Sequence, residues 1–176
     1  QQARRIGRMM EKLLQLSRAT SGIALAGNMF DLVPVIRFLA EELEREKDQP
    51  IEFSGLSHLM IQGDMDATGI LFRNLLENAV LHGTSAQAVS VVISQDHKVL
   101  ICNDCEPLTS DVLQDMEKPF VRGKTDAEGS GLGMAIARQI SQQLHADMTV
   151  SSPIPGTTRG VLVTVRLQIS EIEECI

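Results

Sequence analysis

Residues 67–83 read ATGILFRNLLENAVLHG, and this stretch does most to decide the fold. Its apolar side chains recur at steps of three and four residues, which predicts an amphipathic helix over 67–82; they are Phe72, Leu75, Leu76, Ala79 and Val80. Gly83 follows in the position that favours a left-handed helix stop. A helix with one apolar face packs on a second layer of structure, so the stretch predicts a layered domain.

The other side of this helix is polar, with an unusual choice of residues. Asn74, Asn78 and His82 follow one another at four-residue steps, so they stack on one side, opposite the apolar stripe. A solvated face is the common explanation of such a stripe, yet asparagine is a poor helix former and a face chosen for solubility favours Glu and Lys. An amide oxygen can bind a hard cation without adding charge, which suits a magnesium ion already neutralised by phosphates. On the residues alone both explanations stay open.

A second informative stretch is Gly129-Ser130-Gly131-Leu132-Gly133, which leads into the last predicted helix. Glycines there permit a close backbone approach, and the first N–H groups of the helix face an anion such as a polyphosphate. A dinucleotide-binding loop follows directly on a strand, whereas about 25 polar residues precede these glycines. Gly123-Lys124-Thr125 resembles the end of a Walker A loop, but the glycine required at position 118 is Lys118. The long polar loop over 103–130 itself indicates a functional segment.

The remaining segments supply a sheet and further helices. Asp31 predicts an N-cap for a helix that runs to about Lys47, and the last helix covers 132–144. A short amphipathic piece lies near 112–116. Short apolar runs predict strands at 51–53, 59–61, 89–94, 99–102, 148–151 and 161–167. The order of these elements predicts a layer of helices on a mixed sheet.

Composition excludes several classes of protein. The chain has 176 residues, of which 43% are hydrophobic and 22% charged, so it can bury one core but is short for two domains. Its net charge is −7, and it has no Trp or Tyr, which argues against a nucleic-acid-binding protein. No apolar run reaches the roughly 18 residues of a membrane span, and the N-terminus is not a signal peptide. Three cysteines indicate a reducing, cytoplasmic setting rather than a disulfide scaffold.

The first 20 residues differ from the rest in charge. Five basic side chains stand against Glu11 alone, a local charge of +4, and apolar residues recur at helical spacing over 4–20. This pattern fits equally a helix packed on its own domain and one half of a dimerising hairpin. The expected organisation is therefore a helical segment at 1–22, a core domain at 27–168 and a tail at 169–176.

Five segments, taken in order, resemble the catalytic ATP-binding domain of bacterial sensor histidine kinases, within the ATPase class that includes gyrase B and Hsp90. RNLLENA at 73–79 resembles the N box, CNDCEPL at 102–108 a first glycine box and KPFVRG at 118–123 the F box. GSGLG at 129–133 and GTTRG at 156–160 resemble the second and third glycine boxes. The resemblance covers about 27–168, and the helix at 4–20 is similar to the second helix of the dimerisation and phosphotransfer hairpin. It implies an α+β fold, the Bergerat two-layer sandwich, with a mixed, mostly antiparallel sheet covered on one face by about three helices.

The resemblance also implies roles for individual residues. Asn74, Asn78 and His82 form the expected catalytic set, with Asn78 as the magnesium ligand, and Asn103 stands where the family usually has the Asp that reads the adenine amino group. Asp104 is included beside Asn103, although alternation along a strand points it to the other side. The other nucleotide-binding residues that the resemblance implies are Phe120, Arg122, Lys124, Gly129, Gly131, Leu132, Gly133 and Thr164.

The implied activity is binding of ATP with Mg2+ and transfer of the γ-phosphoryl group to a histidine of the dimerisation hairpin, for relay to an aspartate of a response regulator. The implied parent is a homodimer anchored in the bacterial inner membrane, with this chain as a cytoplasmic domain. The histidines are His58, His82, His97 and His145, none of them on the N-terminal helix, so we expect a fragment of a longer kinase whose phosphoacceptor lies elsewhere.

Two other functions compete with this one. The stretch NAVLHG at 78–83 is also reminiscent of anti-sigma-type serine kinases, which act as partner-switching modules. A degenerate nucleotide-binding domain without transfer activity is the other, because Asn103, Cys105 and Leu81 depart from the usual family pattern.

Overall fold

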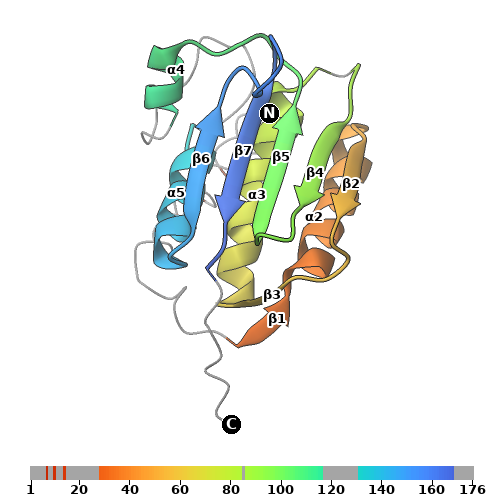
Figure 1. Ribbon diagram of the computed structural model, residues 1–176, viewed down its shortest axis with the longest axis vertical. Helices are drawn as coiled ribbons and strands as arrows, with labels where there is room; N and C mark the ends of the chain where they lie inside the picture. Colours follow the sequence, from red (N-terminus) through yellow and green to blue (C-terminus); the bar gives the residue numbers. More distant parts are fainter. Residues whose placement is uncertain are drawn as a thin grey trace.

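The computed structural model describes residues 28–84, 86–116 and 131–168, together with positions 7, 10 and 14. Helices lie on one face of a twisted sheet, and the other face of the sheet carries no helix among these residues (Figure 1). In order along the chain the elements are β1 (Met29–Asp31), α2 (Leu32–Lys47), β2 (Ile51–Gly55), β3 (Met60–Gln62), α3 (Met65–His82), β4 (Val89–Ile93), β5 (Lys98–Asn103), α4 (Ser110–Asp115), α5 (Gly133–Gln143), β6 (Asp147–Ser151) and β7 (Val161–Arg166).

The main sheet has five strands in the order β2-β4-β5-β7-β6. Its β2–β4 pair is parallel, and its β4–β5, β5–β7 and β7–β6 pairs are antiparallel. The predicted α+β sandwich with a mixed, mostly antiparallel sheet is therefore confirmed. A separate antiparallel pair joins β1 to β3. The sequence did not predict β1, since it has three residues and a single buried side chain, Phe30.

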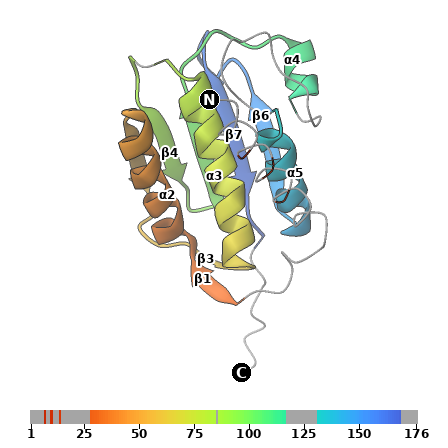
Figure 2. The same cartoon turned by 180° about the vertical axis from the view of Figure 1, so that it is seen from behind.

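The core lies between the sheet and the layer of α2, α3 and α5 (Figure 2). Burial alternates along the central strands, so that Val99 and Ile101 of β5 and Val163 and Val165 of β7 are buried while their neighbours are half-buried or exposed. Asn103 continues the buried series at the end of β5, with 6% of its surface exposed. The alternation of the strand therefore places this polar side chain on the helix-covered side.

The central helix α3 begins two residues earlier than the sequence predicted. Asp64 is its N-cap, and its carboxylate accepts a hydrogen bond of 2.7 Å from the backbone N–H of Ala67. The predicted left-handed stop at Gly83 is wrong, because Gly83 is extended, with φ −73° and ψ 160°. Glycine is needed there for space instead: a Cβ on Gly83 would lie 2.7 Å from the Ala79 carbonyl oxygen.

The other predicted elements are confirmed with shifts of one or two residues at their ends. Asp31 caps α2 by accepting from the backbone N–H of Val33, and the β4–β5 hairpin turns through His97, whose φ is +57°. The short amphipathic piece is α4. Most of the predicted N-terminal helix and the tail lie outside the described residues; Gly7, Met10 and Leu14 are helical and exposed. The described helices include none with the length and apolar character needed to cross a bilayer.

Candidate nucleotide site between α3 and α5

The polar side of α3 meets the start of α5, and these helices run side by side in both views (Figures 1 and 2). Asn74 lies at this contact with 2% of its surface exposed, and its amide donates a 2.7 Å hydrogen bond to the Ile70 carbonyl oxygen. A Cβ on Gly133 would lie 3.3 Å from Asn74 Oδ1, so glycine lets the two backbones approach closely. The explanation of Asn74 as part of a solvated face is therefore wrong, because this amide is enclosed between two helices.

The described end of the glycine segment forms a sharp entry into α5. Gly131 has φ +68°, in the left-handed region that glycine adopts without strain. The next residue, Leu132, occupies the N-cap position and is fully buried in the core. Its side chain therefore anchors the turn in the core, and a nucleotide contact from Leu132 would have to come from its backbone. A leucine has no side-chain oxygen to cap the helix, so the first turn of α5 depends on other acceptors.

Asn78 lies about one helical turn beyond Asn74 on the same side of α3, about 6 Å further along the axis. The residue is half-buried, and its side chain forms no hydrogen bond within the part of the chain that the structure describes. Its amide oxygen is therefore available to a hard cation. The described residues contain no group of three or more His, Cys, Asp or Glu side chains placed to hold a metal ion. A metal bound here would need most of its ligands from phosphate and water.

His82 is the last residue of α3 and is exposed. Nearby protein atoms that exclude part of the water around its ring lower the pKa of His82 below the ordinary value of 6.5. The imidazole is therefore mostly neutral at pH 7 and acts there as a hydrogen-bonding group rather than as a cation.

The C-terminal end of α3 also approaches the end of β5. A Cβ on Gly83 would lie 3.4 Å from the Asn103 Cβ, so this glycine lets the helix end pack directly over the Asn103 side chain. The Asn103 Nδ2 atom is buried and has no hydrogen-bond partner. An unsatisfied buried donor is rare in folded proteins and calls for a ligand, water or strain to explain it.

The 156–160 turn, which precedes β7, packs against the backbone of Asn103. Gly160 has φ +84°, and a Cβ on it would lie 2.8 Å from the Asn103 carbonyl oxygen. The Gly160 N–H donates a 2.8 Å hydrogen bond to the Cys105 carbonyl oxygen. The sequence contains this glycine segment, but only the three-dimensional contact shows that it packs against the end of β5.

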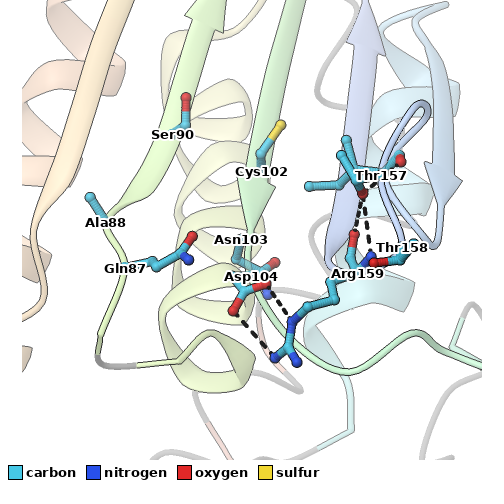
Figure 3. Close-up of a pocket in the computed structure, with 10 residues that line it drawn as sticks. Gln87, Ala88, Ser90, Cys102, Asn103, Asp104, Thr157, Thr158 and Arg159 are labelled. Carbon is cyan, nitrogen blue, oxygen red and sulfur yellow. Dashed lines mark hydrogen bonds and ion pairs between the residues drawn. The ribbon is translucent and has the colours of Figure 1, made fainter.

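Asp104 does not belong with these residues. Its carboxylate accepts a hydrogen bond of 3.1 Å from Arg159 Nε (Figure 3). It also accepts one of 3.2 Å from Thr84 Oγ1, and Arg159 pairs with Glu106 at 2.7 Å. The Arg159 guanidinium holds the pKa of Asp104 below its ordinary value. The Asp104 carboxylate thus has partners within the protein, and this pairing does not favour the expected nucleotide contact.

Asp104 and Arg159 border a hollow of about 350 Å³ on the open face of the sheet (Figure 3). Asn103, Cys102 and Ser90 also line it. This hollow is separate from the α3–α5 contact, because Cys102 and Ser90 are paired residues on the side of the sheet that the described helices leave uncovered.

Thr164 also lies on the open face. It is a half-buried residue of β7 between Val163 and Val165, whose side chains point into the core. The alternation of β7 thus turns Thr164 away from the helices, which does not favour the expected nucleotide contact from this residue. Four other expected contacts, Phe120, Arg122, Lys124 and Gly129, lie outside the described residues.

Comparison with known proteins decides the family. A family model described as "Histidine kinase-, DNA gyrase B-, and HSP90-like ATPase" matches residues 63–171, more than half of the chain. The chain belongs to this ATPase family. The match includes α3, β5, the glycine segment and α5, which are the elements that meet around Asn74 and Asn103.

Curated relatives in this ATPase family are sensor kinases. The chain is 28% identical over 180 residues to the probable sensor kinase SilS of Salmonella typhimurium, covering 93% of this chain and 36% of SilS. It is 29% identical over 178 residues to the sensor protein BasS of Escherichia coli (strain K12), covering 93% of this chain and 48% of BasS. The chain therefore spans less than half the length of these relatives.

Solved structures with the same fold are histidine kinases. A mycobacterial sensor histidine kinase, MprB, superposes with a TM-score of 0.71 at 21% identity, covering 81% of this chain and all of that structure. Full-length ShkA in complex with AMPPNP gives a TM-score of 0.72 at 20% identity, covering 93% of this chain and 36% of ShkA. The predicted type, an ATP-binding catalytic domain of sensor histidine kinases, is confirmed by these matches, and the serine-kinase alternative is not favoured.

Proposed function

We propose that the chain binds ATP with Mg2+ beside the contact of α3 and α5 and transfers the γ-phosphoryl group to a histidine on a dimerisation hairpin. The observation that carries the proposal is the close approach of Gly133 to Asn74, where a Cβ on the glycine would lie 3.3 Å from Asn74 Oδ1. This contact brings the amide side of α3 and the glycine turn together, as a shared phosphate site requires.

Mg2+ fits the donor set on this side of α3. Asn78 offers a neutral oxygen with no internal partner among the described residues, and neutral ligands suit a cation whose charge is already balanced by a triphosphate. When bound, the ion neutralises charge that builds up on the phosphates during transfer. Asn78 holds that ion in place, and the glycine turn before α5 allows the phosphates to approach the backbone.

The residues at this site suit transfer to an imidazole better than hydrolysis. Asn74 and Asn78 carry amides, which cannot accept a proton near neutral pH, so neither can activate a water molecule. A neutral imidazole nitrogen is itself a nucleophile and needs no strong base beside it. The site therefore has to position the phosphoryl group rather than to deprotonate its acceptor.

The partners follow from the type of kinase. The phosphohistidine would pass its phosphoryl group to an aspartate of a response regulator, and the parent protein would be a homodimer anchored in the bacterial inner membrane. The names of the relatives, sensor kinase and sensor protein, support a role in signalling.

A transfer assay tests the proposal. The chain is mixed with ATP, Mg2+ and a separate hairpin from a related kinase that bears the phosphoacceptor histidine. We expect phosphate on the hairpin that is lost in acid and stable in base, the behaviour of phosphohistidine. Acid-stable phosphate on a serine, or tight ATP binding with no transfer to any hairpin tried, would contradict the proposed reaction.

A further inference from the structure

The side chain of Asn103 is the starting point, because its amide nitrogen is enclosed but has no hydrogen-bond partner. Only 6% of the residue is exposed, and Nδ2 has no hydrogen-bond partner. A Cβ on Gly83 would contact the Asn103 side chain, and a Cβ on Gly160 would contact the Asn103 carbonyl oxygen. Burying an amide donor without a partner is unfavourable, so the geometry indicates an acceptor that arrives with a ligand.

The Cys105 side chain, two residues further along the chain, does not satisfy this amide. The Cys105 thiol is close enough for the Asn103 amide to oppose the burial that raises the pKa of Cys105. A thiol sulfur is a weak acceptor, however, and the contact does not reach hydrogen-bond geometry. The Nδ2 donor is thus left for a bound base.

We propose that Asn103 makes the site accept 6-oxopurine nucleotides as well as adenine nucleotides. The inference rests on the proposed function, since it concerns the base of the same nucleotide. An amide carries an acceptor and a donor side by side, so it can pair with adenine by accepting from the 6-amino group and donating to N1. After a half-turn about its last bond it donates to a 6-oxo group and accepts from N1–H.

A carboxylate at this position does not have that freedom. Asp, which the family usually has here, offers only acceptors, so it attracts a 6-amino group and repels a 6-oxo group. Discrimination of this kind depends on the repulsive element as much as on the attractive one. Asn103 removes the repulsion, and the selection for adenine weakens with it.

Titration calorimetry of the 176-residue chain with ADP and with IDP, both with Mg2+, tests this inference. Hypoxanthine differs from adenine at the 6-position and N1, and like adenine it carries no 2-amino group. The comparison therefore isolates the edge of the base that Asn103 would read. We expect the two dissociation constants to agree within about tenfold, because either base finds a donor and an acceptor. Asn103→Asp should then increase the preference for ADP by about tenfold or more, because it restores the repulsion.

Asp104→Asn is the matched control, since it makes the same exchange of carboxylate and amide on the adjacent residue, whose side chain pairs with Arg159. It should leave the ratio of the two dissociation constants unchanged. A wild-type chain that binds ADP more than about 100-fold tighter than IDP overturns the inference and leaves the proposed function standing. Equal ratios in the wild type and a folded Asn103→Asp variant also overturn it, and binding of neither nucleotide overturns both proposals.

Discussion

Two polar regions lie close to the end of β5, and they differ in whether their polar groups form hydrogen bonds within the protein. On the helix-covered side, Asn78 and the Asn103 Nδ2 atom have no hydrogen-bond partner among the described residues. On the open face, Asp104 and Arg159 satisfy one another and add bonds to Thr84 and Glu106. The satisfied region is explained by the protein's own structure, whereas the unsatisfied one needs a ligand to explain it.

The comparison also shows why charge alone is a poor guide to a binding site. Asp104 and Arg159 are charged residues near the end of β5, and they border a hollow of about 350 Å³. Their charges already cancel within the protein, so they offer little to a polyphosphate. The uncharged amides on the other side keep their hydrogen-bonding capacity for a ligand.

The largest effect is expected from Asn78→Ala, which removes the proposed metal ligand from the unsatisfied region. Affinity for ATP with Mg2+ should fall by about 100-fold or more, close to 3 kcal/mol, while the fold remains intact because Asn78 has no hydrogen bond to lose among the described residues. Calorimetry measures the affinity, and circular dichroism checks the fold. An unchanged affinity would remove Asn78 from the site.

A valine at Gly133 tests the close contact between the two helices. Gly133→Val places a branched side chain against Asn74 Oδ1, so we expect a loss of about 2 kcal/mol in unfolding free energy together with weaker nucleotide binding. Urea unfolding measures the first effect and calorimetry the second. Gly69→Val is the control in α3, where a Cβ meets nothing within 4 Å, and it should change neither quantity appreciably. Equal effects from the two variants would show that the contact is not tight.

Arg159→Ala probes the satisfied region and should leave nucleotide affinity unchanged. The folded pKa of Asp104 is lower than the unfolded value of 3.8, so its ion pair stabilises the protein above that pH and is lost as the pH falls below it. Thermal unfolding from pH 6 to pH 3 should therefore show a smaller drop in Tm for Arg159→Ala than for the wild type. A loss of ATP binding in this variant would place Arg159 in the nucleotide site after all.

The smallest effect concerns His82, at the edge of the unsatisfied region. Because its pKa is lowered by partial desolvation, its ring should titrate below 6.5, and protonation should slightly destabilise the folded state as the pH falls through that range. Proton NMR of the imidazole follows the titration, and His82→Gln assigns the resonance by removing it. A midpoint at or above 6.5 would mean that the ring is fully solvated or carries an anionic partner.

The regular spacing of apolar residues explains which elements could be predicted from the sequence. The helices over 32–47, 65–82 and 133–143 and the strands over 89–93 and 98–103 have regular apolar spacing, and all were predicted within two residues at their ends. Alternation along β5 also gave the opposite directions of Asn103 and Asp104. The same alternation applies to Thr164 in β7. Its neighbours Val163 and Val165 are buried against the helices, so Thr164 lies on the open face of the sheet.

Contacts between distant segments were not available from any local pattern. Nothing in the spacing of α3 distinguishes Asn74, enclosed against Gly133, from an exposed asparagine. Gly83 was predicted to stop a helix through its dihedral angles, but glycine is needed there because a Cβ would lie 2.7 Å from the Ala79 carbonyl oxygen. The residues that complete the site are therefore defined by packing, which the sequence encodes only through the whole fold.

The most direct test of the central claim is a 15N-labelled NMR titration of the chain with ADP and Mg2+. If α3 and the glycine turn share one nucleotide site, four signals should shift together, and their shifts should fit a single dissociation constant. The signals are the side-chain amides of Asn78 and Asn103 and the backbone amides of Gly131 and Gly133. The Arg159 Nε signal on the open face should not follow them. Shifts confined to Arg159 and its neighbours, or shifts of α3 without those of the glycine turn, would contradict the account.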